Sequence, residues 1–184
     1  MVTLSTVLLN LLTVTAAITD LRYHKIYNWT TYPGIILALA VNFAEHGWDD
    51  GHPGIGHPGL EDSLLGFAVC GGLMLVSYVF FNVGGGDVKL IAMVGAFLGM
   101  YQGVEVVLWT FVLGGAAGLA LLIWRVGALK LVTGTVRHVL WSLRLVSWLP
   151  LTDAERQQLQ PSLYLAPSTV IAVAIVCFDL LRFL

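Results

Sequence analysis

Charged side chains are scarce in this sequence, because Asp, Glu, Lys and Arg make up only 11% of its 184 residues. Soluble domains carry about a quarter charged residues, so this composition excludes an ordinary soluble protein. A hydrophobic share of 58% and a mean hydropathy of +0.85 indicate a polytopic membrane protein instead. We expect residues 1–184 to form a single membrane domain, with the lipid bilayer as its surroundings and with no nucleic acid as a partner.

Cysteine is also scarce. The two cysteines, Cys70 and Cys177, both lie inside apolar runs, and the sequence has no CxxC pair. This pattern excludes a zinc ribbon and a disulfide framework. The N-terminal stretch is apolar but lacks both a basic leader and a small-residue cleavage site, which favours a retained first span over a cleaved signal peptide.

Six apolar stretches approach the roughly 20 residues that a membrane-spanning helix needs. They lie at about 2–19, 31–44, 63–82, 88–101, 103–124 and 164–184. If the N-terminus is outside, eight of the nine basic residues fall in the cytoplasmic segments 20–30, 82–89 and 125–162. Since Lys and Arg are enriched in cytoplasmic loops, this orientation is preferred. The predicted fold is therefore an all-α integral membrane protein with about six transmembrane helices and its N-terminus outside.

The cytoplasmic segment 125–162 is apolar, yet it carries regularly spaced basic residues. Lys130, Arg137 and Arg144 follow one another at intervals of seven, which places them on one face of a helix. Trp141 and Trp148 repeat with the same interval. A basic face with aromatic residues elsewhere is typical of an amphipathic helix that lies in the membrane interface. The alternative is a solvated cytoplasmic helix that only sets the topology.

Two acidic residues stand at the ends of apolar segments. Asp20 follows the first span and Asp87 precedes the fourth, so the predicted topology places both at the cytoplasmic boundary. Two carboxylates that share a site do not both ionise readily, so one holds a proton while the other acts as a base. Such a pair activates a water for attack on a peptide carbonyl and protonates the leaving nitrogen. Taken singly, Asp87 could be a helix cap and Asp20 the end of a span beside basic residues.

Three glycines precede Asp87, and Lys89 follows it. Glycine lets the backbone bend sharply and lets another chain approach closely, although Gly84 and Gly86 could also serve tight helix packing. Lys89 either supports the loop and tunes the acid or is an interfacial lysine that sets topology. The stretch 45–62 contains three histidines, but its Gly- and Pro-rich spacing fits no fixed ligand geometry, so we expect no metal and no cofactor.

The sequence resembles a known family in two places. Gly84-Gly85-Gly86-Asp87 is similar to the GxGD motif of membrane aspartic proteases, and Val88-Lys89-Leu90 with Gly95 and Gly99 resembles the prepilin peptidase (type IV leader peptidase) branch. The stretch from Asp20-Leu21-Arg22 to Ile26-Tyr27-Asn28 is similar to the other half of that signature, with Tyr27 where the family commonly has proline. Without the CxxC-containing cytoplasmic domain, the chain resembles the short, protease-only form of tight-adherence (Flp) pilus systems.

The resemblance implies a multi-pass endopeptidase of the inner membrane, with its active site facing the cytoplasm. It would remove the leader of a type IV prepilin-like membrane substrate, with Asp20 and Asp87 as catalytic residues and with Gly84, Gly86 and Lys89 supporting the substrate and the loop. One alternative is a presenilin-like intramembrane protease, although Thr19 precedes Asp20 and no Pro-Ala-Leu motif occurs. The other is a non-catalytic small transporter or pilus-assembly protein, since transporters also contain glycine-rich broken helices.

Overall fold

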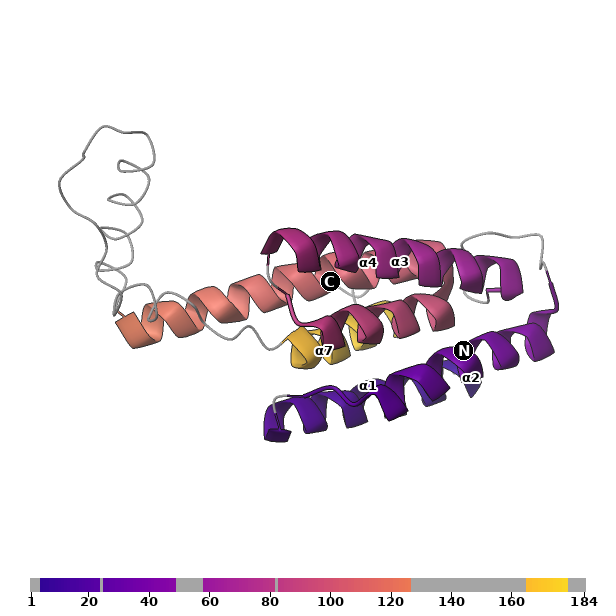
Figure 1. Ribbon diagram of the computed structural model, residues 1–184, viewed down its shortest axis with the longest axis horizontal. Coiled ribbons are helices and arrows are strands. Elements are labelled where there is room, and N and C mark those ends of the chain that lie inside the picture. The colour runs from indigo at the N-terminus through magenta and orange to yellow at the C-terminus, as the bar shows by residue number, and fades with distance from the viewer. Residues whose placement is uncertain (1–3, 24, 49–57, 82, 127–164, 179–184) are drawn as a thin grey trace, which may run out of the picture. The chain divides into compact units, whose positions relative to one another are not determined.

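The computed structural model describes residues 4–23, 25–48, 58–81, 83–126 and 165–178 (Figure 1). These residues form five helices, namely α1 (Leu4–Tyr23), α2 (Asn28–His46), α3 (Leu60–Phe81), α4 (Gly85–Val126) and α7 (Leu165–Cys177). Three stretches, Leu4–Tyr23, Leu60–Phe80 and Gly85–Leu121, are long and apolar enough to cross a membrane, and α7 is a shorter apolar helix. The all-helical class is therefore confirmed for the described residues, whereas the amphipathic helix predicted within 125–162 falls almost entirely outside them.

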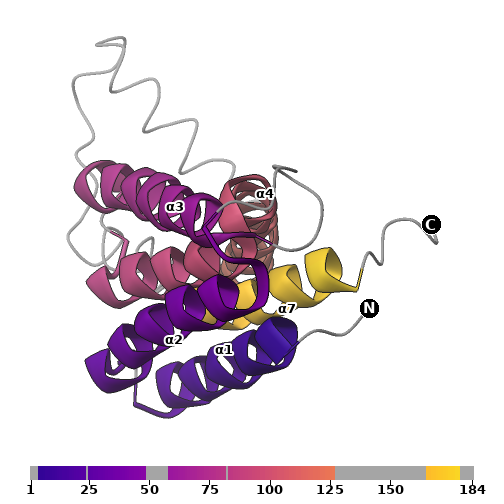
Figure 2. The same cartoon turned by 90° about the vertical axis from the view of Figure 1, so that its right-hand side faces the viewer.

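The chain divides into two compact units, of which the first comprises Met1–Leu113 and Tyr164–Leu184 and the second Gly114–Leu163. Within the first unit, α1 packs against α2 and α7, and α2 packs against α3. Two views at right angles show these helices side by side with their axes roughly aligned (Figures 1 and 2). Both predicted acids belong to this first unit.

Helix α4 is broken at Gly99, whose φ of 76° and ψ of −174° are not helical. A positive φ of this size favours glycine, because a Cβ would be strained there. A Cβ added to Gly103 would lie 3.1 Å from the Cα of Gly95, although a straight helix would separate these residues by about 12 Å along its axis. The chain therefore folds back at Gly99, near the end of the segment 88–101 that the sequence predicts as one span and before the segment 103–124 that it predicts as the next.

Asn42 satisfies backbone groups that the break leaves open. The last carbonyl groups of a helix have no partner inside that helix. Asn42 of α2 is only 1% exposed, and its Nδ2 donates to the carbonyl oxygens of Ala96 and Phe97 at 3.1 and 3.2 Å. The same side chain accepts a hydrogen bond from Ser5 of α1 at 2.9 Å and donates one to Ser63 of α3 at 2.7 Å. A single buried amide thus joins four helices next to the break.

The other side of the break is held by α3. The N–H of Met100 donates to Oδ1 of Asp62 at 3.1 Å. A Cβ added to Gly99 would collide with the carboxylate of Asp62, and one added to Gly66 would collide with the backbone of Gly95. The close approach of α3 to the turn therefore depends on glycines, which have no side chain. This contact fixes the position at which the first half of α4 ends.

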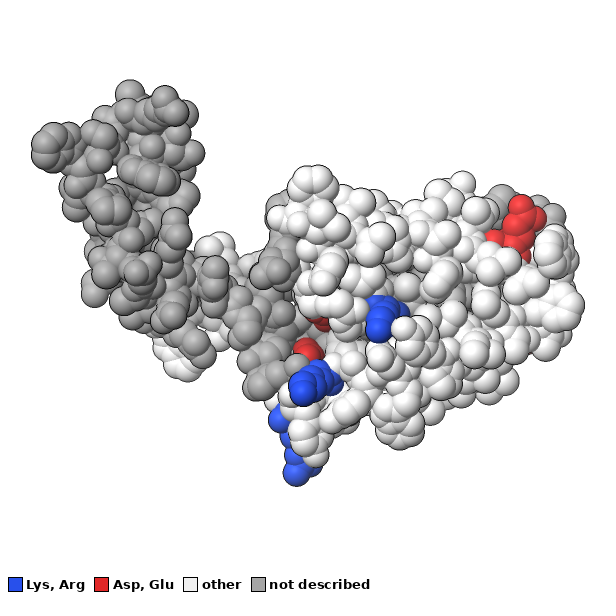
Figure 3. Space-filling view, viewed as in Figure 1, with Lys and Arg blue, Asp and Glu red and all other residues white. Residues whose placement is uncertain are grey.

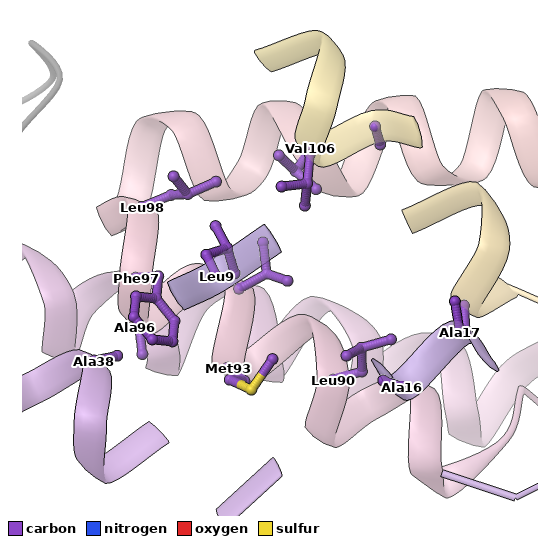
Figure 4. Packing of buried hydrophobic residues seen from close by; sticks show 14 residues of the cluster. Leu9, Ala16, Ala17, Ala38, Leu90, Met93, Ala96, Phe97, Leu98 and Val106 are labelled. Atoms are coloured by element: carbon purple, nitrogen blue, oxygen red, sulfur yellow. The ribbon is translucent and has the colours of Figure 1, made fainter. Parts of the chain in front are cut away.

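The core of the first unit is apolar and draws on α1, α2, α4 and α7 (Figure 4). Ala16 and Ala17 of α1 pack there with Leu90 and Val106 from the two halves of α4. Many large apolar side chains point outward instead, including Ile36 at 69% exposure. An apolar outer surface of this extent fits helices surrounded by lipid rather than by water.

Candidate active site

Asp20 lies in the last turn of α1. The helix continues to Tyr23, beyond the end at residue 19 that the sequence predicts. The Asp20 side chain is buried, with 9% exposed, and it lies one turn beyond the core residues Ala16 and Ala17. A carboxylate at the edge of an apolar helix is costly, and residues of this kind usually have a function.

Asp87 lies in the first turn of α4 and is also only 9% exposed. Its N–H donates to the carbonyl oxygen of Gly84 at 3.0 Å, and the helix already begins at Gly85. Asp87 is therefore inside the first turn and not the residue that precedes the helix, as a simple cap would be. A carboxylate in this position is stabilised by the positive end of the helix dipole.

The structure brings the two acids together. Ile26, which follows Asp20 by six residues, packs against Gly86, the residue before Asp87. The end of α1 and the start of α4 therefore meet in one region of the unit, and each carries one buried acid. In the space-filling view, small acidic patches lie among Lys and Arg at one end of the described helices, and a separate acidic group lies at the opposite end (Figure 3).

Gly84 makes room for the carboxylate of Asp87. A Cβ built on Gly84 would lie 2.9 Å from Oδ2 of Asp87, which is closer than unbonded atoms normally approach. The carboxylate therefore folds back over the backbone at the start of its own helix. The space beside Gly84 is filled by Asp87, so the predicted clearance for a substrate at this glycine stays a prediction.

Gly86 makes room for the connection that follows Asp20. A Cβ built on Gly86 would lie 2.9 Å from Cβ of Ile26. Ile26 belongs to the short segment that joins α1 to α2. The glycine turn of α4 thus packs directly on the chain that leaves α1, and this contact couples the positions of the two halves of the sequence signature.

Lys89 forms a second connection between these halves. Its Nζ donates to Oδ1 of Asn28, the first residue of α2, at 2.8 Å. The same ammonium lies 5.1 Å from the centre of the Tyr32 ring, a distance typical of a cation–π contact. These contacts agree with the prediction that Lys89 supports the loop. The sequence identified Asn28 only as part of a motif and gave no indication that Lys89 is its partner.

Tyr27 stands where the resembled family commonly has proline, and its backbone is extended, with a φ of −78° and a ψ of 135°. This φ is close to the value of about −65° that proline imposes. Its carbonyl oxygen accepts hydrogen bonds from the N–H of Thr30 at 3.2 Å and from the Thr30 hydroxyl at 2.7 Å. From this turn into α2, Ile26 contacts Gly86 and Asn28 contacts Lys89, both in the first half of α4.

Only one of the three histidines in the stretch 45–62 is described. His46 ends α2, whereas His52 and His57 lie outside the described residues. Within the ranges that the structure describes, no three His, Cys, Asp or Glu side chains converge on a point where they could hold a metal ion.

The sequence was also compared with known proteins. The family model described as the type IV leader peptidase family matches residues 7–119. This range is more than half of the chain and includes both acids, the glycine turn and Lys89. Neither a curated protein nor a solved structure matches significantly.

Proposed function

The chain belongs to the type IV leader peptidase family, and from this premise we propose that it removes the leader from a prepilin-like membrane protein by using Asp20 and Asp87 as a catalytic pair. Membership makes it an aspartic-type prepilin peptidase with membrane helices. It also favours this activity over the presenilin-like protease and over the transporter or assembly protein. The pair itself is the part of the proposal that needs an experiment.

One observation supports the catalytic assignment: two buried carboxyl groups, one in the last turn of α1 and one in the first turn of α4, lie where the segment after α1 packs on Gly86. In the proposed reaction, one carboxylate removes a proton from water, and the resulting oxygen attacks the carbonyl carbon of the scissile bond. The protonated carboxyl group donates its proton to the carbonyl oxygen. The carboxyl group that took the proton from water then gives it to the peptide nitrogen, and the C–N bond breaks. A hydroxyl group of the tetrahedral intermediate returns one proton to the pair as the new carbonyl forms.

We further propose that the site faces the cytoplasm and that the complete chain has six spans with its N-terminus outside. The distribution of charge supports this orientation. The described Lys and Arg side chains, Arg22, Lys25 and Lys89, belong to the segments next to the two acids, and such residues prefer the cytoplasmic side. The substrate would then present a short basic leader in the cytoplasm, followed by an apolar helix in the bilayer, and Flp-type pilins are the proposed class.

The experiment is a processing assay with the full-length protein and a prepilin in membranes. The changes Asp20→Asn and Asp87→Asn keep the size of each side chain and remove its ability to exchange a proton. We expect each variant to leave the prepilin unprocessed. Glu105→Gln is the matched control, because Glu105 is an exposed acid of α4, and this variant should cleave like the wild type. Normal processing by either aspartate variant, present at the wild-type level, would remove the pair from the mechanism.

A further inference from the structure

The hydroxyl group of Thr110 is unusual among the described helices. Thr110 is 1% exposed, and its Oγ1 has no hydrogen-bond partner within the part of the chain that the structure describes. Other helical threonines use a carbonyl oxygen three or four residues earlier in their own helix, namely Thr13, Thr15, Thr19, Thr31 and Thr169. A buried hydroxyl without a partner loses its hydration and gains nothing in return, so it requires an explanation.

The fold of α4 places Thr110 at the level of the candidate active site. Gly95 and Gly103 touch and stand equally far from Gly99 on its two sides. The two halves of α4 are therefore antiparallel, and residues equally distant from Gly99 lie side by side. Thr110 comes as many residues after Gly99 as Val88 comes before it. Along the helix axes, Thr110 therefore lies at the same height as the first turn of α4, which contains Asp87.

The packing of the two halves shows which faces meet. Leu90 and Val106 belong to one buried cluster, and Ile91 and Val107 belong to another. Both clusters contain residues from both halves of α4, so these faces of the two halves are turned towards common cores. The two halves therefore share buried contacts beyond the turn at Gly99.

Asp87 and Thr110 continue these same faces by one more turn. Asp87 precedes Leu90 and Ile91 by three and four residues, and Thr110 follows Val106 by four. Side chains at such spacings lie on one face of a helix. Asp20 has the same relation to Ala16, four residues earlier in α1 and also in the core. Asp20, Asp87 and Thr110 come from three helical segments, and their buried polar side chains therefore lie at the same end of the apolar core.

We propose that Thr110 binds the substrate by donating its Oγ1 hydrogen bond to a main-chain carbonyl oxygen next to the scissile bond. This inference rests on the proposed function. A peptide held in extended form at the edge of a membrane has lost its helical hydrogen bonds, so its carbonyl groups need donors from the protein. The two aspartates share one proton and offer mainly acceptor oxygens. The neutral hydroxyl group of Thr110, on the facing half of α4, supplies the hydrogen-bond donor that the two aspartates lack.

The test compares Thr110→Val with Thr110→Ser. Valine keeps the shape of threonine and removes the hydroxyl, whereas serine keeps the hydroxyl. With a purified prepilin, we expect Thr110→Val to raise KM by about twofold to tenfold, the effect of losing one neutral hydrogen bond. Thr110→Ser should stay within about twofold of the wild-type KM. Thermal unfolding should show that Thr110→Val is at least as stable as the wild type, because the valine variant has no unpaired hydroxyl.

Thr13→Val is the matched control, because Thr13 is equally buried but donates to its own helix, and its KM should not change. An unchanged KM for Thr110→Val, or an equal rise for Thr110→Ser and Thr110→Val, would overturn the inference. The aspartate variants separate this outcome from a failure of the proposed function. If Asp20→Asn and Asp87→Asn abolish cleavage while Thr110→Val has the wild-type KM, only the role of Thr110 is lost.

Discussion

The contact between Gly86 and Ile26 gives the sharpest test of how the two motifs are held together. In Gly86→Ala, the new methyl group would lie 2.9 Å from Cβ of Ile26, whereas carbon atoms in contact normally lie about 3.5–4.0 Å apart. Ile26 Cβ is fixed to the backbone, so the chain between α1 and α2 must move by roughly 0.6–1 Å to restore that contact. Forcing an extra methyl into a packed site costs about 1–3 kcal/mol.

The same displacement should affect catalysis, because the moving segment follows directly after the helix that carries Asp20. A shift of about 1 Å in catalytic geometry can reduce a rate by about 100-fold. We therefore expect Gly86→Ala to slow prepilin cleavage by about 10-fold to 100-fold and to lower the unfolding temperature. Initial cleavage rates in detergent and thermal unfolding of the same samples measure the two effects.

Gly85→Ala is the matched control, since its added Cβ would meet only a Tyr78 ring carbon at 3.8 Å. That distance is ordinary contact, and alanine suits a helix better than glycine. Gly85→Ala should therefore be at least as stable as the wild type and cleave at a similar rate. If Gly85→Ala and Gly86→Ala behave alike, the contact with Ile26 does not position the site and the reasoning fails.

Two further predictions concern contacts that link the helices. Lys89→Met removes the hydrogen bond to Asn28. A double-mutant cycle with Asn28→Ala should give a coupling free energy of about 1 kcal/mol in unfolding experiments. A coupling near zero would mean that the hydrogen bond contributes nothing to stability. Asn42→Leu leaves the carbonyl groups of Ala96 and Phe97 unpaired in the interior, so it should destabilise the protein by about 2–4 kcal/mol; an unfolding temperature equal to that of the wild type would contradict the buried network.

The sequence was sufficient to predict the helical class and to single out Asp20 and Asp87 as candidates, because both depend on local patterns. Long apolar stretches define helices, and charged residues at their ends stand out. The sequence placed a gap between two spans at residue 102, three residues after the observed break at Gly99. Its exact position depends on the contacts with Asp62 and Gly66, which come from another helix and leave no signal in the neighbouring sequence.

The partners of individual side chains could not be predicted in the same way. From the sequence, Asn42 is only a polar residue in an apolar stretch, yet it satisfies the carbonyl groups at the break in α4. The contact of Gly86 with Ile26 joins residues far apart in the chain, and only the tertiary fold reveals it. For Thr110 the sequence offered no more than a polar residue in an apolar helix, because the lack of a partner is a property of packing.

Cysteine cross-linking between positions 20 and 87 tests most directly whether the two acids share one site. Asp20→Cys and Asp87→Cys would be combined in a chain with Cys70 and Cys177 replaced by alanine, and the protein treated in membranes with a short thiol cross-linker. The account predicts an efficient cross-link for this pair. Asp20→Cys with Asp62→Cys is the control, because Asp62 lies beside the turn at Gly99, at the other end of the unit. A 20–87 pair that cross-links no better than the 20–62 pair would contradict the account.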